Sequence, residues 1–169
     1  VGTTSTVLGA QITNTFSAAS KNGMTLNETS GTTGATFVYF AASGTAIGNI
    51  SRVTTTNAVA YNTSSDYRLK ENIQPMTGAL SKVVALNPVT FTWKDCGVDA
   101  EGFIAHELAK ICPDAVTGEK DAVDADGNPV YQGIDTSFLV ATLTAAIQEQ
   151  QAIIEQLKAD VAALKGAQA

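Results

Sequence analysis

The tail from Thr136 onward carries the most regular hydrophobic pattern in the chain. Its apolar residues alternate at spacings of four and three, which is a heptad repeat and predicts a coiled-coil helix over residues 135–166. Gln150 interrupts the apolar series, and a polar residue in a coiled-coil seam can set the register or the number of helices. A stripe this narrow favours self-association over packing of one amphipathic helix on its own domain. The predicted seam comprises Leu143, Ile147, Gln150, Ile154, Leu157, Val161 and Leu164.

Residues 77–112 have mixed patterns that predict a small α/β region. Thr77 is a candidate N-cap for a helix that ends before Pro88. Residues 89–93 alternate as a half-buried strand, residues 95–99 read as a turn, and residues 102–112 lead into a second short helix, which Pro113 stops. The apolar positions of the first helix are Leu80, Val83, Val84 and Leu86.

Residues 1–62 read as short strands separated by turns. Residues 36–40, 47–53 and 57–61 have strand-like composition. Such a segment is either a flexible linker or a set of strands that complete their core against identical copies, and an aromatic cluster favours the strands because a linker has no use for it. The aromatic residues are Phe37, Tyr39 and Phe40, and the turn signals are Asn22-Gly23, Ser30-Gly31 and Ser43-Gly44.

The charge distribution places a boundary near Ser65. Up to that point the only charged residues are Lys21, Glu28 and Arg52, whose net charge is +1. Because the whole chain has a net charge of −6, the part after Ser65 has a net charge of −7. The composition break predicts two regions, residues 1–65 and residues 66–169, and the second divides into a globular part, 66–134, and the helix, 135–166. A net negative chain without a basic cluster argues against nucleic acid and against an anionic membrane surface as partners.

Metal sites, disulfides and membrane segments find little support in the sequence. No apolar run is long enough to span a bilayer, and the start at Val1 is not a signal peptide and indicates a piece of a longer polypeptide. Cys96 and Cys112 are expected to be reduced, buried or half-buried thiols, and His106 is the only histidine, so no zinc site and no cofactor are expected.

Residues 124–129 lie between two short strand-like pairs and predict a hairpin tip. Asp124, Asp126, Asn128 and Asp135 resemble the acidic positions of a calcium loop. However, Pro129 stands where that loop requires glycine, and the flanks are not helical, so calcium binding is not expected.

Ser65 and Lys70 form the one pair in the chain that could perform nucleophilic chemistry without a histidine. A lysine with its ordinary pKa of about 10.4 is protonated at neutral pH and cannot accept the hydroxyl proton. Burial or a neighbouring cation such as Arg68 lowers the pKa of an amine and can make it a base. From spacing alone the signal is weak, because a serine five residues before a lysine occurs by chance in most proteins, and a solvated turn that leads into a strand is the alternative.

Residues 65–73, with the sequence Ser-Asp-Tyr-Arg-Leu-Lys-Glu-Asn-Ile, resemble the opening motif of the C-terminal intramolecular chaperone domains of phage tailspikes and tail fibres, the endosialidase-type peptidase S74 family. The resemblance extends over residues 62–165. His106 departs from the pattern, since many relatives have glutamine there, and it is expected to be a packed or surface residue. Further matches occur in the family's order at residues 91–93, 102–107, 113–116, 131–135 and 146–157.

The resemblance implies a trimerisation chaperone that is attached to a fibre and then releases itself. The family's nucleophile falls on Ser65 and its base on Lys70, with the scissile bond between Ser65 and Asp66; Asp66 and Arg68 are expected to position the site. It also implies an α+β fold: an intertwined β fibre segment, then a small mixed α/β domain ending in the coiled-coil helix, in a homotrimer. The expected partners are identical copies and the upstream fibre polypeptide, first in the host cytoplasm during assembly and then, for the fibre part, in the virion tail.

Two other functions compete with this interpretation. The same fold could remain attached as a permanent, non-cleaving structural or receptor-binding fibre tip. An enzyme that acts on an external substrate would need a catalytic pair such as Glu101 and Glu107, but these residues flank a short helix and are better explained as solvated charges.

Overall fold

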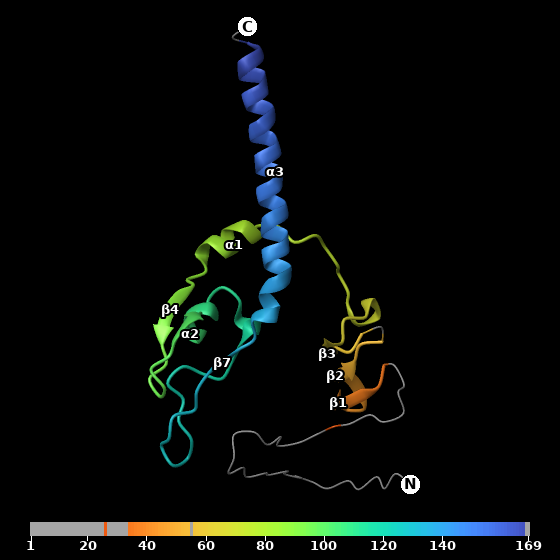
Figure 1. The fold of residues 1–169 in the computed structure, drawn as a ribbon, viewed down its shortest axis with the longest axis vertical. Coiled ribbons are helices and arrows are strands. Elements are labelled where there is room, and N and C mark those ends of the chain that lie inside the picture. Colours follow the sequence, from red (N-terminus) through yellow and green to blue (C-terminus); the bar gives the residue numbers. More distant parts are fainter. Residues whose placement is uncertain (1–25, 27–33, 55, 168–169) are drawn as a thin grey trace. The chain divides into compact units, whose positions relative to one another are not determined.

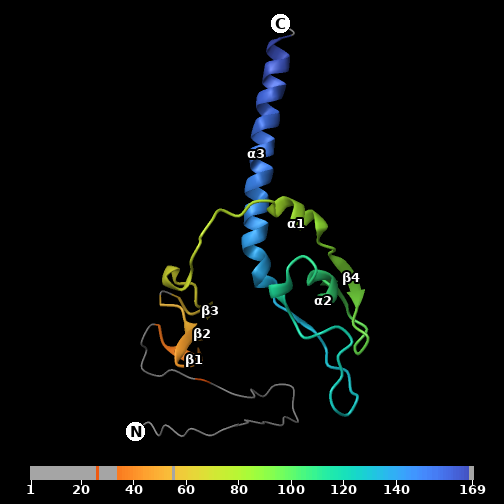
Figure 2. The ribbon, with the colours of Figure 1, turned by 180° about the vertical axis from the view of Figure 1, so that it is seen from behind.

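The computed structural model describes Leu26 and residues 34–54 and 56–167. The turns predicted at Asn22-Gly23 and Ser30-Gly31 lie outside the described residues. The chain divides into two compact units, between Asn72 and Ile73, and each is described by itself (Figures 1 and 2).

The first unit contains a three-stranded antiparallel sheet in the order β1 (Thr36–Ala42), β2 (Thr45–Arg52) and β3 (Val59–Thr63). These strands confirm the three predicted from the sequence. Ser43 and Gly44 form the predicted turn between β1 and β2, with φ angles of 49° and 81°. Both angles are in the left-handed region that a tight two-residue hairpin requires and that glycine adopts without strain.

β2 contains an irregularity at Ile47 that matters for the site described below. Phe40 of β1 pairs with Gly48, and the next residue, Ala41, pairs with Ala46. Ile47 is therefore an extra residue on β2, which is the arrangement of a β-bulge. On its other edge β2 pairs regularly with β3, from Arg52 opposite Val59 to Gly48 opposite Thr63.

The second unit begins with α1 (Ala79–Ala85) and β4 (Val89–Thr92), both as predicted. A turn then leads to β5 (Asp99–Gly102), which pairs antiparallel with β4 and was not predicted. The second helix, α2 (Ala105–Leu108), is shorter than expected and continues as a turn up to Cys112. The remaining elements are η2 (Pro113–Ala115), β6 (Val116–Thr117), β7 (Gly133–Ile134), η3 (Thr136–Phe138) and α3 (Leu139–Gly166).

The N-terminal cap of α1 differs from the prediction. The N-cap residue is Gly78, and not Thr77, at a φ of 70°. The free N–H groups of Ala79 and Leu80 donate to the two carboxylate oxygens of Glu149 on α3, at 3.0 and 2.8 Å. A carboxylate at a helix start satisfies unpaired amides and complements the helix dipole, so a side chain distant in sequence replaces the local cap.

Two small apolar clusters form the core of this unit. In the first, α1 lies across the N-terminal half of α3 (Figures 1 and 2). There Ala79 packs on Ala145 and Ala146. The short side chains permit this close approach of the two helices. The second cluster joins Leu108 of α2, Ala115 of η2 and Leu139 of α3. Within the described residues no large side chain is completely buried, so one copy of the chain encloses little apolar volume.

α3 confirms the predicted terminal helix and exposes the predicted seam. The contact with α1 uses Ala145, Ala146 and Glu149, which lie on a different face of the helix from the heptad positions. The C-terminal half of α3 projects beyond the other elements of its unit (Figure 1). The apolar seam residues are 39% to 66% exposed, from Ile154 to Ile147.

Candidate active site

The candidate site lies in the first unit, directly after the last strand of its sheet. β3 ends at Thr63, and a short 3-10 helix, η1 (Tyr67–Leu69), follows after three residues. Asp66 is its N-cap, and the Asp66 carboxylate accepts the backbone N–H of Arg68 at 2.9 Å. Aspartate is one of the best residues for this position because its short side chain reaches the free amides of the first turn.

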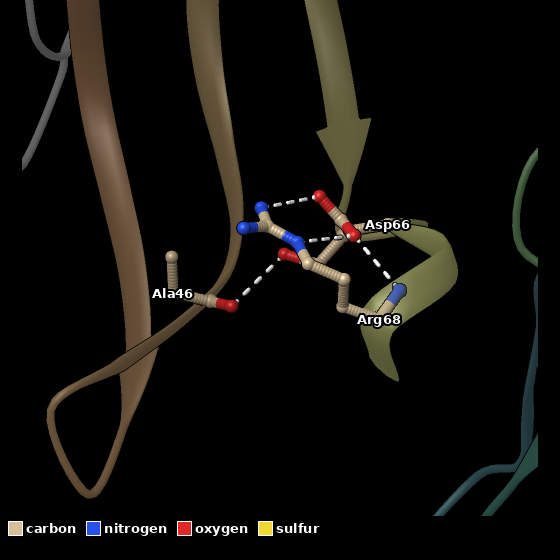
Figure 3. A network of polar contacts seen from close by, with 4 residues as sticks. Ala46, Asp66 and Arg68 are labelled. Carbon is tan, nitrogen blue, oxygen red and sulfur yellow. Dashed lines mark hydrogen bonds and ion pairs between the residues drawn. The ribbon is translucent and has the colours of Figure 1, made fainter. Parts of the chain in front are cut away.

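Asp66 and Arg68 form a two-pronged ion pair (Figure 3). The guanidinium Nε donates to Oδ1 at 2.9 Å and Nη2 donates to Oδ2 at 2.7 Å. Hydrogen bonds from the Arg68 side chain, followed by the one from its backbone N–H, lower the pKa of Asp66, and the carboxylate in turn raises the pKa of Arg68. Both side chains are exposed, so this pair fixes the geometry of the turn more than it stabilises the fold.

The same turn brings the predicted nucleophile and base together. Lys70 follows η1 with extended backbone, and its N–H donates to the Tyr67 carbonyl at 3.1 Å. Its Nζ lies 2.6 Å from Ser65 Oγ, where the amine donates to the hydroxyl oxygen. A neutral amine at the same distance could instead accept the hydroxyl proton, which is the contact that a serine–lysine pair needs. Both residues are exposed in the single chain.

Ser64, which sequence reasoning missed, attaches the chain to β2 immediately before the nucleophile. Its N–H donates to the Ile47 carbonyl at 3.0 Å, and its hydroxyl donates to the Ala46 carbonyl at 2.9 Å. Figure 3 shows the Ala46 carbonyl as the acceptor beside the Asp66–Arg68 pair. A serine beside another serine carries no signal of its own, because the carbonyls that it binds belong to a strand 17 and 18 residues earlier.

The other acidic residues considered for catalysis or metal binding have structural roles in the described residues. Glu107 accepts a hydrogen bond from Asn87 Nδ2 at 2.9 Å, and Glu101 lies on β5. Asp124 closes the predicted hairpin tip by accepting the N–H groups of Asp126 and Asn128 at 2.9 and 2.8 Å. These bonds, those from Asn128 first, lower the pKa of Asp124. The bridge between Val123 and Pro129 confirms the hairpin.

The described residues contain no group of histidine, cysteine and acidic side chains placed to hold a metal ion. Cys112 is a half-buried free thiol as expected, whereas Cys96 is free but exposed, because it lies in the turn between β4 and β5. His106 is half-buried beside Asp121, in agreement with a packed or surface residue. Among the described helices, none has the length and apolar composition needed to cross a membrane.

Comparison with known proteins places the site at the start of a family match. The chaperone of endosialidase family (peptidase S74) matches residues 65–117. Two relatives are the long tail fiber protein Gp37 of Enterobacteria phage K3 and that of Enterobacteria phage T2, each 29% identical to this chain over 99 residues. The aligned region is 56% of this chain but only 8% and 7% of the two relatives, so the chain spans a small part of their length.

The family match begins at Ser65, whose hydroxyl contacts Lys70, and ends at Thr117 on β6. It therefore includes the candidate site, α1, the β4–β5 hairpin and α2, and the resemblance of the opening motif is confirmed. Residues 65–117 of this chain are thus similar to the chaperone of endosialidase family (peptidase S74).

Proposed function

We propose that this chain is an intramolecular trimerisation chaperone of a phage tail fibre or tailspike, which releases itself by cutting the peptide bond between Ser65 and Asp66. The observation that carries the proposal is the 2.6 Å contact between Lys70 Nζ and Ser65 Oγ. The hydroxyl belongs to the residue before the scissile bond, and the amine is at proton-transfer distance from it.

The proposed reaction is an attack of the Ser65 hydroxyl on the carbonyl of the same residue, which forms a four-membered lactone, followed by hydrolysis. Neutral Lys70 Nζ takes the Ser65 hydroxyl proton, and Oγ attacks the carbonyl carbon of Ser65. The bond from that carbon to the Asp66 nitrogen breaks, and the proton passes from Lys70 to this nitrogen. This step releases Asp66 as a free amine, and water then opens the lactone, which restores the Ser65 hydroxyl and leaves a carboxylate on the upstream piece.

The exposure of Lys70 explains why the proposed cleavage would wait for assembly. An amine in water is protonated at neutral pH and does not act as a base. Burial by neighbouring copies would disfavour the charged form of Lys70, so that its neutral amine could accept the Ser65 hydroxyl proton. The exposed seam of α3 and the small apolar clusters of one copy support assembly of several copies, and a heptad seam is a physical means of collecting three chains.

The proposed partners follow from the same arrangement. Three identical copies associate through α3, and residues 1–65 form the end of the fibre polypeptide that the chaperone serves. Strands that pair between chains close long loops and fold slowly, so a helix that gathers the chains raises their effective concentration. Assembly would take place in the host cytoplasm, after which the fibre part would remain in the virion tail and the rest would be released.

Denaturing mass spectrometry of the refolded 169-residue chain tests this function. We expect wild type to split between Ser65 and Asp66, while Ser65→Ala and Lys70→Ala remain whole. Lys82→Ala is the matched control, because Lys82 is an exposed lysine on α1, and it should be cut like wild type. A whole wild-type chain would reject self-cleavage and favour the second candidate, a permanent trimeric cap of the fibre, which the unshielded Lys70 of the single copy also permits.

A further inference from the structure

Ser64, the residue that precedes Ser65, is attached to β2 by two hydrogen bonds. Its backbone N–H and its hydroxyl donate to the carbonyls of Ile47 and Ala46, two consecutive residues. Successive carbonyls of a regular strand point to opposite edges, so one residue does not normally bind two of them in a row. The extra residue at Ile47 interrupts that alternation and brings both carbonyls within reach of Ser64.

The neighbouring residues of β2 and β3 approach each other closely. Gly48 is buried opposite Thr63, and a methyl group added to it would lie 2.5 Å from the backbone oxygen of Asn62. This distance is shorter than any normal contact, so only glycine fits there without displacing β3. The Asn62 side chain also crosses to β2, where its Nδ2 donates to Asn49 Oδ1 at 2.8 Å and to Ser51 Oγ at 3.0 Å.

The chain is also fixed on the other side of the scissile bond. Asp66 caps η1 and is paired with Arg68, and the Asp66 carbonyl accepts the N–H of Leu69 at 3.1 Å. Ser65 therefore stands between two neighbours that are each held in place. An intramolecular attack depends strongly on the orientation of the reacting atoms, and fixing both flanks restricts the rotation of the Ser65 carbonyl relative to its hydroxyl.

We infer that Ser64 is a positioning residue for self-cleavage and that, with Ala46, Ile47 and Gly48, it forms a clamp that orients the Ser65 carbonyl. The inference rests on the proposed function. Ser64 touches no reacting atom; it acts through the backbone of Ser65. The clamp exists only when the end of β3 is paired with β2, so cleavage depends on a folded fibre end as well as on assembly of the helices.

The clamp also determines where the chain end that cleavage creates is held. After cleavage Ser65 becomes the C-terminal residue of the upstream piece, and Ser64 next to it remains bound to β2. The new carboxyl end is thus held on the sheet, one residue beyond its last anchor.

The test compares cleavage rates of refolded Ser64→Ala, Ser64→Thr and Thr63→Ala chains by denaturing mass spectrometry over time. We expect Ser64→Ala to be about tenfold slower, the effect of one lost orienting hydrogen bond. Ser64→Thr retains the hydroxyl and should recover to within about twofold of wild type. Thr63→Ala is the matched control, because the Thr63 side chain makes no hydrogen bond in the described part of the chain, and it should be cut at the wild-type rate.

Two further measurements separate positioning from folding. The dependence of the Ser64→Ala rate on pH should have the wild-type shape, because Lys70 remains the base. The melting temperature of each variant, measured with Lys70→Ala added to prevent cleavage, should change little. Gly48→Ala provides an independent variant, and its displaced β3 should slow cleavage at least as much as Ser64→Ala does.

Each outcome of these cleavage experiments either supports or overturns the inference. A wild-type chain that is never cut overturns the proposed function, and the clamp with it. If wild type is cut and Ser64→Ala matches its rate, the clamp alone is overturned. The clamp is also overturned if Ser64→Thr fails to recover the rate, or if the pH profile of Ser64→Ala moves.

Discussion

At the scale of single residues, the candidate site is a short turn whose parts hold each other in place. The Asp66 carboxylate caps η1 and binds the Arg68 guanidinium, and the same turn delivers Lys70 Nζ to Ser65 Oγ. All of these residues are exposed. Water therefore competes for each bond, and the geometry is held by several weak contacts together.

Lys70→Arg distinguishes a base from a cation that only positions the hydroxyl. Arginine keeps the charge and the reach, but it does not lose its proton in proteins, so we expect cleavage to fall at least about 1000-fold, as on loss of a general base. Denaturing mass spectrometry over time measures the rate. Cleavage of Lys70→Arg at more than about a tenth of the wild-type rate would show that Lys70 is not the base.

Arg68→Ala tests the positioning role of the ion pair. Without the guanidinium, the Asp66 side chain keeps, among the described residues, only its bond to the backbone N–H of residue 68. We expect cleavage to slow about tenfold, because the turn that carries Lys70 becomes less ordered. Arg52→Ala is a control that removes an arginine from the same unit, on β2. An Arg68→Ala chain cut as fast as wild type would remove Arg68 from the site.

At the scale of elements, the second unit depends on one long-range contact. The Glu149 carboxylate caps α1 by accepting from Leu80 and Ala79, and these bonds lower the pKa of Glu149. The helix has no side-chain cap of its own. Seven-residue helices are too short to persist alone, so α1 requires both this cap and the apolar contact with α3.

Glu149→Ala should lower the melting temperature of the second unit by roughly 4–8 °C, the shift expected when a domain of about 100 residues loses one helix cap. Glu155→Ala on the exposed face of the same helix is the control, because Glu155 binds only Gln151 and Lys158 of α3 in the described residues. Circular dichroism with heating measures both. Equal melting temperatures of the two variants would contradict a role of Glu149 in holding α1.

The pH dependence of stability follows from the same carboxylate. Folding lowers the pKa of Glu149, so its contribution is complete above the pKa of the unfolded chain, about 4.3, and is lost as the pH falls through the lower folded value. We expect the difference in melting temperature between wild type and Glu149→Ala to be constant from about pH 5 to about pH 7, where the carboxylate is ionised in both the folded and the unfolded chain. The difference should shrink below about pH 4. A difference that grows on acidification would reverse the sign of this linkage.

At the scale of the whole molecule, the exposed seam of α3 and the small apolar clusters of the second unit favour a chain that completes its structure with other copies. The buried residues of the two apolar clusters are alanines and leucines. The seam residues Ile154, Leu157 and Val161 line an open apolar groove along α3. In the proposed assembly, packing of this surface against identical helices would add the apolar burial that one copy lacks.

Leu157→Asp should abolish assembly and self-cleavage together, although it does not touch the candidate site. A charge in the centre of a seam removes apolar burial in every copy and should weaken association at least about 100-fold. Sedimentation measures the number of copies, and mass spectrometry measures cleavage. Ala159→Asp, which adds the same charge outside the seam, is the control; rapid cleavage of a monomeric Leu157→Asp chain would separate cleavage from assembly.

The sequence by itself determined the features that depend on local period and local chemistry. The heptad spacing predicted α3, and the strand patterns and the Ser43-Gly44 turn predicted the hairpin of the first unit. Residue types and the resemblance of the opening motif together indicated Ser65 and Lys70, whose Oγ and Nζ lie 2.6 Å apart. These features follow from side-chain periodicity, turn dihedral angles and the reach of a single turn, all of which operate within a few residues. The similarity of residues 65–117 to the chaperone of endosialidase family was also predicted from the order of the motifs.

Only the tertiary structure decided which distant groups complete those elements. Glu149 caps α1 from 70 residues away, and Ser64 binds carbonyls that a bulge in β2 exposes to it. Neither contact has a local pattern, because each depends on where the chain returns in space and on small residues, Ala146 and Gly48, that allow close approach. Long-range hydrogen bonds of this kind are fixed by packing, so the cap at Thr77 was wrongly predicted and the role of Ser64 was missed.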